Sequence, residues 1–547
     1  MGDFSWARLR RSITNRLRGN GIRDCLKPVR THRWMRKGEL ISKLSKISRP
    51  FRFSIIINWY PGKDISSIKS TIRSINYQIY SDWELCLITT INPSECTFLE
   101  TENIPVSFYT NLDDSLRAAK GHFVIPVGPG DQLVPEALAE LVLFLDRFPD
   151  LDLVYSDEDY IDDCGKHSRC VCKPDWSPDL LLSHNYIGRL AAYRKEKLLL
   201  AGGFSSEGDI SDDYALALRF TELAQSVGHI PQILYSRFIH APLVSSELTQ
   251  VILDNEMRRR GWQTHAKAVK TNTGVFRVHW SMIGTPLISI IICTHDRADL
   301  LEVCLRSIFE KSTYSKFEVI LVDNGSKEPE TNELIHFWSE REPVRFRSIR
   351  MNVQFNFSLL NNQAATQARG ELLLFLNNDT QVVSPQWLEE MAAQAQRTQI
   401  GAVSALLVFP DQRVQHAGIL VGGKELAFHA FRGLSTNLST LPIRLIVPSN
   451  FPALTGACLM MRKELFLSFG GFNEDLAISY GDVDLCLRLK KAGYFNILLP
   501  YIKLIHHESA TRGYETTLKK RRRLRYEARL LKKLWPDLER LDRTLTA

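Results

Sequence analysis

The chain contains the same α/β pattern twice, and this repeat constrains the fold more than any other feature. Each copy begins with an apolar, β-rich run, FRFSIIINWYPG (51–62) or LISIIICTHDR (287–297). A helix-length stretch then leads into a second run, DWELCLITT (82–90) or FEVILVDNGS (317–326). Apolar runs of strand length that alternate with helical segments predict a mostly parallel sheet in each copy.

Two later pairs of segments extend the repeat. AKGHFVIPVGPGDQL (119–133) parallels ARGELLLFLNNDTQV (368–382), and LLLAGGFSSEGDISDDYALALR (198–219) parallels LFLSFGGFNEDLAISYGDVDLCLR (465–488). A chain of 547 residues also exceeds one ordinary core, so two domains are expected. We predict a basic N-terminal extension (1–50), a first α/β domain (51–246), a connector (247–285), a second α/β domain (286–515) and a basic C-terminal helix (516–547).

The composition is that of a folded protein rather than a membrane-spanning one. Hydrophobic residues make up 44% of the chain and charged residues 24%. No apolar run reaches the ~18 residues that a spanning helix needs, and the N-terminus has no apolar signal region. The 10 cysteines are scattered along the chain, which favours a reducing compartment. We therefore expect a cytoplasmic protein.

The net charge of +8 is concentrated at the two ends. Residues 1–50 hold 14 Lys and Arg against 3 acidic residues, residues 519–547 hold 11 against 4, and the remainder is net negative. This distribution argues against a nucleic-acid groove along the body and favours peripheral contact with an anionic membrane surface, such as the inner membrane. Solvated ends with no partner are an equal alternative for each tail.

Both basic ends also carry an amphipathic helix pattern. The apolar positions on one face are Trp6, Leu9, Ile13 and Leu17 near the N-terminus, and Leu524, Ala528, Leu531, Trp535 and Leu538 near the C-terminus. Such a helix either lies at a lipid interface or packs onto a neighbouring domain, and the pattern alone leaves both open.

Polar side chains follow the strands of the second copy. LLLFL (372–376) leads directly into NND (377–379), and Asp296 and Asp323 each stand just past an apolar run. Ligands of parallel α/β sheets bind beyond the carboxyl ends of the strands, so we expect these carboxylates to meet at one edge. Capping of a turn or helix is the alternative for Asp296 and Asp323.

An ordered series of motifs in the second copy resembles a known family. The motifs are SIIICTHDR (289–297), VILVDNGS (319–326), FNFSLLNNQAATQARGELLLFLNNDT (355–380), VQHAGI (414–419), LTGACLMMR (454–462), GGFNE (470–474), GDVDLCLRLKKAGY (481–494) and HHESATRG (506–513). They resemble family 2 glycosyltransferases, and most of all the two-domain bacterial enzymes of O-antigen and rhamnan assembly, often called rhamnosyltransferases. The resemblance covers about residues 51–515 and implies two tandem GT-A (Rossmann-like) domains.

The resemblance implies an inverting transfer of a sugar from a nucleotide-sugar donor to a growing, lipid-linked cell-surface polysaccharide such as O-antigen. The donor implied is dTDP-rhamnose or a UDP-sugar. LNNDT takes the place of the family's Asp-x-Asp motif, so Asp379 would bind Mn²⁺ or Mg²⁺, and His506 would be a second ligand. Oxygen ligands suit these cations, which stabilise a departing nucleoside diphosphate.

The remaining site residues follow from the same resemblance. Asp323 would accept the imide N–H of a uracil or thymine ring. Asp482, at the start of a helix, would be the base that deprotonates the acceptor hydroxyl; a carboxylate favoured by the helix dipole is the alternative. Asp484 would be structural. The other donor-binding residues implied are Thr294, Asp296, Arg297, Asn361, Asn362, Asn377 and Asn378.

The first copy departs from these motifs. LITTINPS (87–94) stands in place of VDNGS, and Gly128 and Gly130 stand where the second copy has Asn377 and Asp379. Asp213 still stands where a base would be. We interpret the first copy as a degenerate domain that packs against the second or binds the acceptor glycan.

Two other functions are compatible with the sequence. A nucleotidyltransferase also uses a parallel sheet with carboxylate-bound Mg²⁺, although CTHDR (293–297) is not the glycine- and lysine-rich phosphate loop it would need. A catalytically weak or inactive glycan-binding or scaffold subunit of a polysaccharide synthase complex is the non-enzymatic alternative.

Overall fold

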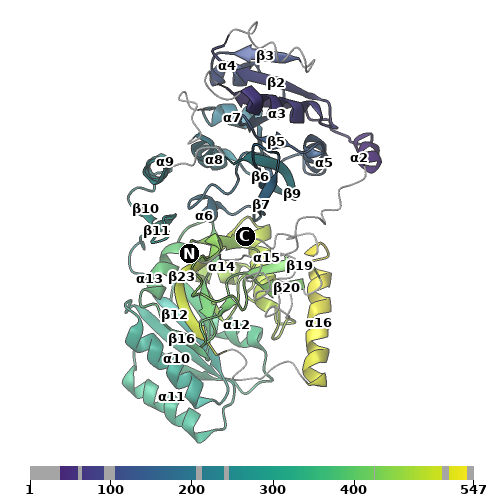
Figure 1. Ribbon diagram of the computed structural model, residues 1–547. Helices are drawn as coiled ribbons and strands as arrows, with labels where there is room; N and C mark the ends of the chain where they lie inside the picture. The colour runs from purple at the N-terminus through teal and green to yellow at the C-terminus, as the bar shows by residue number, and fades with distance from the viewer. Residues whose placement is uncertain are drawn as a thin grey trace, which may run out of the picture. The chain divides into compact units, whose positions relative to one another are not determined.

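The computed structural model describes residues 37–59, 65–91, 105–204, 212–239, 245–423, 426–507 and 517–538. The predicted N-terminal helix and the end of HHESATRG after His507 lie outside these ranges. The chain divides into two compact units (Figure 1). The second unit comprises Trp176–Tyr186 and the chain from Ser245 to Arg543, and nearly all the rest belongs to the first. In the described ranges, no helix has both the length and the apolar character to cross a membrane.

The first unit is built on one mixed sheet with the strand order β3-β2-β1-β4-β8-β6-β9-β5, and β7 pairs with β6. The strands are β1 (Phe53–Asn58), β2 (Trp83–Ile88), β3 (Val106–Tyr109), β4 (Phe123–Val127), β5 (Gln132–Leu133), β6 (Leu153–Ile161), β7 (His167–Val171), β8 (Ala191–Arg194) and β9 (Val227–Phe238). Its helices are α2 (Lys37–Leu44), α3 (Ile65–Asn76), α4 (Leu112–Ala118), α5 (Ala137–Arg147), α7 (Lys195–Leu200) and α8 (Asp212–Leu223).

The second unit is built on a larger sheet with the order β14-β13-β12-β15-β22-β17-β23-β16. These strands are β12 (Ile288–Thr294), β13 (Phe317–Asp323), β14 (Phe346–Arg350), β15 (Leu372–Asn377), β16 (Thr380–Val382), β17 (Ile400–Val408), β22 (Cys458–Arg462) and β23 (Phe495–His506). Shorter strands are β18 (Val414–His416), which pairs with β17, β21 (Ser449–Phe451), which pairs with β23, and the hairpin of β19 (Ile419–Gly422) and β20 (Leu426–His429).

Most helices of the second unit alternate with the strands of this sheet along the chain. They are α6 (Pro178–Leu181), α10 (Ala298–Lys311), α11 (Pro329–Arg341), α12 (Phe357–Gln367), α13 (Trp387–Ala395), α14 (Lys463–Ser468), α15 (Gly481–Lys491) and α16 (Leu518–Leu534), with a 3₁₀ turn η3 (Ile443–Leu445). The predicted connector forms α9 (Ser246–Arg259) and a hairpin of β10 (Ala266–Lys270) and β11 (Phe276–Trp280).

The two sheets share one topology, which confirms the predicted duplication. In each, three parallel pairs are followed by one reversed strand, β8 or β22, and then by two strands that again run parallel to each other. Six strands along each path therefore point the same way. The predicted class, two α/β domains with mostly parallel sheets, is confirmed.

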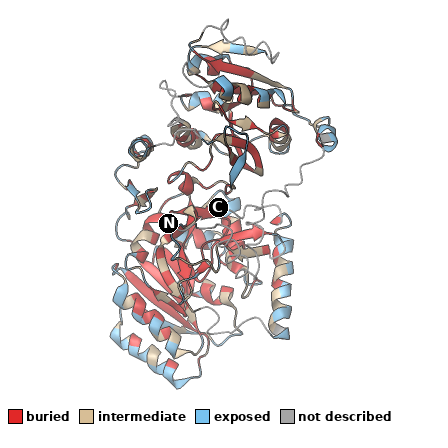
Figure 2. Ribbon diagram, viewed as in Figure 1, coloured by how far each residue is buried: buried red, intermediate tan, exposed pale blue. Residues whose placement is uncertain are grey.

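Apolar side chains on both faces of the central strands hold the second unit together. β13 is buried along its whole length, and Ile290, Leu321 and Leu374 of three neighbouring strands pack in one cluster with Trp338 and Trp387. Each such aliphatic side chain contributes about 1.5–3 kcal/mol when it is fully buried. The outer sides of α10, α11 and α16 are exposed (Figure 2). The carboxyl ends of these strands are therefore fixed in position by a well-packed core.

The basic C-terminal helix α16 packs onto the second unit. Leu531 and Leu538 are buried, as is Glu527, while Arg525 and Arg529 on the other side are exposed. The amphipathic pattern was compatible with a lipid interface or with packing on a domain. For this helix, the structure shows packing of the apolar stripe on a domain. The basic residues are left on the outer surface.

Candidate active site

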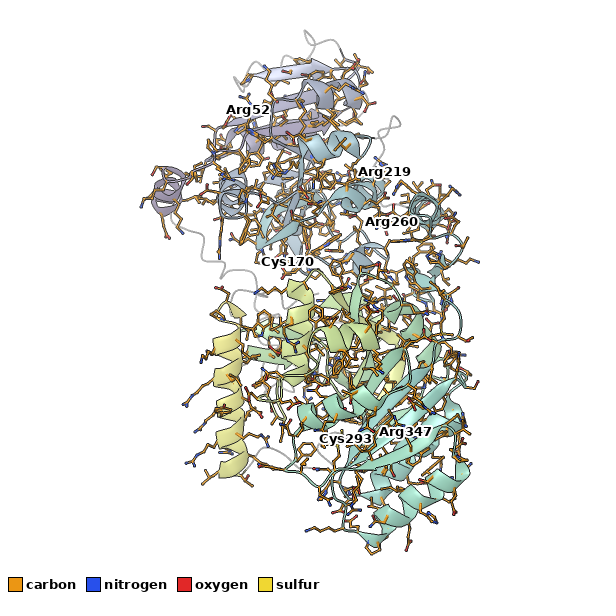
Figure 3. All side chains as sticks on the ribbon, turned by 180° about the vertical axis from the view of Figure 1, so that it is seen from behind. Arg52, Cys170, Arg219, Arg260, Cys293 and Arg347 are labelled. Atoms are coloured by element: carbon orange, nitrogen blue, oxygen red, sulfur yellow. The ribbon has the colours of Figure 1, made fainter. Side chains whose placement is uncertain are left out.

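The carboxyl ends of β12, β13 and β15 lie side by side at one edge of the second sheet. The strand register pairs Thr294 with Asp323 and Cys293, labelled in Figure 3, with Asn377. Thr294 and Asn378 are joined directly, because the Asn378 side-chain amide donates a hydrogen bond of 3.0 Å to the Thr294 hydroxyl. The predicted apolar runs of 287–297, 317–326 and 372–376 therefore end at this edge.

Asp379 and His506 form a buried acid–imidazole pair at this edge. Asp379 Oδ1 lies 3.1 Å from His506 Nε2, and the Asn377 amide nitrogen lies 3.4 Å from the same ring atom. The pairing of β16 with β23 places Thr380 opposite His506, which brings the two side chains together. His506 Nδ1 faces Gln415 Oε1 at 3.2 Å, so Nε2 is the atom directed at Asp379.

This pair fits a divalent cation that is shared with a diphosphate. In the part of the chain that the structure describes, no group of three or more His, Cys, Asp and Glu side chains is arranged to hold a metal. Asn377 stands where a second carboxylate would complete such a group. Mg²⁺ is commonly bound by one or two carboxylates together with substrate phosphates, so one carboxylate and one imidazole are a sufficient protein contribution.

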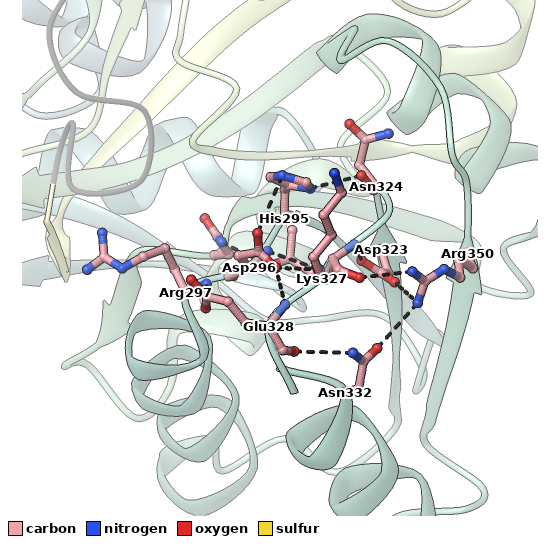
Figure 4. Close-up of polar contacts among 12 residues, drawn as sticks. His295, Asp296, Arg297, Asp323, Asn324, Lys327, Glu328, Asn332 and Arg350 are labelled. Carbon is pink, nitrogen blue, oxygen red and sulfur yellow. Dashed lines mark hydrogen bonds and ion pairs between the residues drawn. The ribbon is translucent and has the colours of Figure 1, made fainter. Parts of the chain in front are cut away.

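Asp296 and Arg297 form a turn that joins the ends of β12 and β13. Both have left-handed backbones, with φ of 55° and 61°. Asp296 Oδ1 accepts the backbone N–H groups of Lys327 at 2.7 Å and Glu328 at 2.9 Å (Figure 4). These hydrogen bonds, the one from Glu328 most of all, lower the pKa of Asp296. The turn-capping alternative for Asp296 matches these contacts.

Asp323 is held by an arginine that sequence reasoning missed. Its Oδ1 accepts the Ser326 N–H at 2.8 Å, and its Oδ2 lies 3.1 Å from Arg350 Nη1 (Figure 4). Arg350 also donates to the Ser326 carbonyl at 2.9 Å. The only sequence signal was the strand FRSIR (346–350), whose last residue pairs with Asp323 in the sheet. The buried carboxylate is thus fixed in orientation at the strand end.

The amides of Asn361 and Asn362 are used within the fold. Asn361 is buried and donates to the Phe357 carbonyl at 2.8 Å, one turn earlier in α12. Asn362 accepts the Phe472 N–H and donates to the Phe472 carbonyl, both at 2.9 Å. These contacts tie α12 to the GGFNE turn. They do not join the two asparagines to the Asp379 and His506 pair.

Asp482 lies in the first turn of α15, after Tyr480, which has a left-handed backbone with φ of 67°. Its Oδ2 accepts the Gly456 N–H at 2.8 Å, and its Oδ1 accepts the Val483 N–H at 2.9 Å. Burial raises the pKa of Asp482 above the ordinary value, while these N–H groups act in the opposite direction. A partly exposed carboxylate with a raised pKa is suited to accept a proton.

In the first unit, an arginine lies beside the aspartate that corresponds to Asp482. Arg189 Nη1 lies 2.9 Å from Asp131 Oδ2, and its Nε lies 2.9 Å from Asp213 Oδ2. Asp131 is fully buried and also accepts the N–H groups of Gly128 and Phe238 and the Tyr235 hydroxyl. One guanidinium therefore forms ion pairs with both Asp131 and Asp213.

The repeat shows which residue replaces that arginine in the second unit. β8 pairs Arg194 with Phe123, and β22 pairs Arg462 with Leu372, so the two strands are in the same register. IGRLAAYR (187–194) therefore aligns with TGACLMMR (455–462), and Ala457 stands in the place of Arg189. Sequence reasoning missed this difference, although it was visible as Gly-Arg against Gly-Ala.

Part of the second unit matches a family model. Residues 289–468 match the model of glycosyl transferase family 2. The matched segment runs from β12 to the end of α14 and includes Thr294, Asp323 and Asp379, whereas Asp482 and His506 follow it. The second unit thus contains a segment that matches glycosyl transferase family 2, in agreement with the predicted family.

Curated relatives extend the similarity over both units. The chain is 34% identical over 531 residues to the uncharacterized protein y4gI of Sinorhizobium fredii, an alignment that covers 91% of this chain and 58% of the relative. It is 37% identical over 469 residues to the O-antigen biosynthesis protein RfbC of Myxococcus xanthus, with 81% and 36% covered. The chain thus spans 58% or less of the length of these two relatives.

A third relative matches a smaller part of the chain. The N-acetylglucosaminyl-diphospho-decaprenol L-rhamnosyltransferase of Mycobacterium tuberculosis is 26% identical over 250 residues, which is 42% of this chain and 78% of that protein. Among solved structures, GalNAc-T7 with UDP, GalNAc and Mn²⁺ matches with 15% identity and a TM-score of 0.36, covering 42% of this chain and 45% of that one.

Proposed function

We propose that the second unit transfers a sugar, with inversion, from a nucleotide-sugar donor to a growing cell-surface polysaccharide such as O-antigen. The observation that carries the proposal is the buried pair of Asp379 and His506 at the end of β15, in a unit that contains a segment matching family 2. Asp482, a carboxylate with a raised pKa at the start of α15, supplies the base. RfbC and the rhamnosyltransferase are relatives whose names point the same way.

The strand ends would bind the donor. Asp379 and His506 would hold Mn²⁺ or Mg²⁺, which when bound neutralises charge that develops on the departing nucleoside diphosphate. Asp323, fixed by Arg350, has lone pairs left to accept the imide N–H of a uracil or thymine ring. We therefore favour a dTDP- or UDP-sugar, with dTDP-rhamnose the first donor to test.

Asp482 would deprotonate the attacking hydroxyl of the acceptor. The N–H groups of Gly456 and Val483 fix the carboxylate in position. Burial raises its pKa, which brings it closer to the pKa of the acceptor hydroxyl than the pKa of an exposed aspartate is. A base with a raised pKa takes up a proton more readily during bond formation. Attack on the face opposite the leaving group then inverts the anomeric carbon.

The first unit would support transfer without catalysing it. Arg189 forms one ion pair with Asp213, the counterpart of Asp482, and another with Asp131. Burial raises the pKa of Asp213, as it does for Asp482, but the Arg189 guanidinium acts in the opposite direction and occupies the carboxylate in an ion pair. We propose that this unit packs against the second or binds the acceptor glycan.

We further propose that the protein works peripherally on the inner face of a bacterial membrane, on a lipid-linked acceptor. The support is the charge at the ends of the chain and the basic outer side of α16, where the exposed residues include Arg521, Arg522, Arg525, Arg529, Lys532 and Lys533. Each basic side chain near an anionic surface contributes about 1 kcal/mol, so a few are enough to retain the protein there.

Asn377 favours a second candidate function, a catalytically weak or inactive scaffold subunit, because it leaves the metal site with one carboxylate.

The experiment that separates these functions is incubation of the full chain with Mn²⁺ and a panel of nucleotide sugars, followed by detection of released nucleoside diphosphate. Transferase function predicts its release with at least one sugar. Formation of a nucleotide sugar from a nucleoside triphosphate and a sugar phosphate, with release of pyrophosphate, would indicate a nucleotidyltransferase. Donor binding without release of nucleoside diphosphate would indicate the scaffold.

A further inference from the structure

The C-terminal helix α16 contacts the turn before Asp482 through a buried carboxylate. Glu527 is 1% exposed. Its Oε1 accepts the Ile478 N–H at 3.2 Å and its Oε2 accepts the Ser479 N–H at 3.1 Å. A buried carboxylate is costly unless it is paired or hydrogen-bonded, and Arg523 approaches it only to 3.8 Å. The backbone of the turn is therefore the main partner of this acid.

A second contact from α16 reaches the other side of Asp482. The Trp535 indole N–H, just past the helix end, donates to Asp484 Oδ1 at 2.9 Å. The other oxygen of Asp484 accepts from Arg488 Nε at 2.8 Å, one turn further along α15. The structural role predicted for Asp484 is thus observed. The C-terminal segment holds the chain both before and after Asp482.

The turn between these two contacts has a conformation that needs support. Tyr480 has a left-handed backbone, which residues with a side chain rarely adopt, and Asp482 follows two residues later. On the other side, the Ala477 and Leu476 carbonyls accept hydrogen bonds from Phe357 and Ser358 of α12. The turn is therefore held between α12 and α16.

We infer that α16 positions Asp482, and that Glu527 and Trp535 are positioning residues for sugar transfer. The inference rests on the proposed role of Asp482 as the base. Leu531 and Leu538 anchor the helix segment, and Glu527 and Trp535 then fix the turn on either side of the carboxylate. Small displacements of a catalytic group lower turnover strongly, because the reacting atoms must be aligned.

The basic residues of α16 lie on a different side from these contacts. Arg521, Arg525 and Arg529 are exposed, whereas Glu527 and Leu531 are buried. Substitutions on the inner side therefore test positioning without changing the outer charge. Tyr526, next to Glu527 but 61% exposed, offers a matched control on the same helix.

The kinetic experiment compares Glu527→Ala, Trp535→Phe and the control Tyr526→Phe in the full chain. We expect Glu527→Ala to lower kcat roughly 10-fold to 10²-fold with the donor KM unchanged, because the donor site is on other strands. Trp535→Phe keeps the ring and removes only the N–H, so a smaller loss of kcat is expected. Tyr526→Phe should match the wild type.

Hydrogen exchange supplies a readout that does not depend on activity. In Glu527→Ala, the amides of residues 474–484 should exchange faster, while those of β12 and β15 stay protected. Unchanged exchange and unchanged kcat would overturn the inference, and so would a general loss of protection that includes β12 and β15. Asp482→Asn is measured in parallel: if it keeps full turnover, the proposed base is wrong, whichever result the α16 variants give.

Discussion

In the first unit, Arg189 Nε lies 2.9 Å from the carboxylate of Asp213. Asp482 is the counterpart of Asp213 in the second unit, and its carboxylate accepts the N–H of Gly456 instead. One residue accounts for this difference, because the repeat places Ala457 where the first unit has Arg189. The two copies thus keep the same sheet and the same aspartate. They differ in whether that carboxylate forms an ion pair with an arginine.

Transplanting this arginine should inactivate the second unit. In Ala457→Arg, the guanidinium would pair with Asp482 and lower its pKa, so turnover should fall by about 10²-fold or more. Ala457→Ser, which adds little volume and no charge, is the control and should keep most of its activity. Kinetics and thermal unfolding of both variants check this. Full activity in a folded Ala457→Arg protein would contradict the explanation.

Removal of Asp379 should abolish turnover and leave the fold intact. It is the one carboxylate of LNNDT, and its loss should cost several kcal/mol of transition-state stabilisation. The companion variant Asn377→Asp adds a second carboxylate and should lower the Mn²⁺ concentration that gives half-maximal turnover. Metal titrations of both variants provide the measurement. Near-normal turnover of Asp379→Ala would rule out this metal site.

The pH dependence of kcat should reflect the raised pKa of Asp482. The base must be ionised, so activity should fall as the pH drops through this pKa, and the fall should begin at a higher pH than for an ordinary aspartate. Asp482→Asn should remove this acid limb from the residual activity. An identical acid limb in the variant would mean that another group is responsible.

The same shift has a consequence for stability. A carboxyl group whose folded-state pKa is raised favours the folded state while it is protonated, and this contribution is lost as the pH rises through the folded pKa. At neutral pH the ionised Asp482 is therefore a cost to the fold. Asp482→Asn should unfold at the same or a higher temperature than the wild type, as measured by thermal denaturation.

Binding to anionic membranes should depend on the outer side of α16. Full-length protein should co-sediment with anionic liposomes at low salt and less at high salt, because exposed charges are screened. Reversal of Arg521, Arg525 and Arg529 to Glu should weaken binding by about 1 kcal/mol or more per residue. Neutral liposomes serve as the control. Equal binding of the reversed variant would leave the membrane contact to other parts of the chain.

The sequence was sufficient for the features that depend on local pattern. Apolar periodicity predicted the strands, and the rule that parallel strands end at one edge predicted that Asp296, Asp323 and Asp379 stand at the same edge of the sheet, where β12, β13 and β15 are adjacent. The domain limits and the roles of the site residues stay predictions. Local pattern also left the position of α16 open, since an apolar stripe fits a lipid surface as well as a protein one.

Contacts between distant segments could not be predicted. Arg350 on Asp323, Arg189 on Asp213 and Glu527 on the 478–479 backbone join residues 24 to 49 positions apart. Nothing in a local pattern indicates which arginine will reach which carboxylate, because the sheet register and the helix packing decide it. For Asn362 the same limit applies: its partner, Phe472, is 110 positions away.

The most direct test is a comparison of Asp482→Asn with Asp213→Asn in nucleoside diphosphate release from an accepted nucleotide sugar. If the second unit alone catalyses transfer, Asp482→Asn should lose roughly 10²-fold or more in turnover, as expected for loss of a general base. Asp213→Asn should stay close to the wild type, because Arg189 already holds that carboxylate in an ion pair. A stable Asp213→Asn protein without turnover, beside an active Asp482→Asn, would place catalysis in the first unit and contradict the assignment.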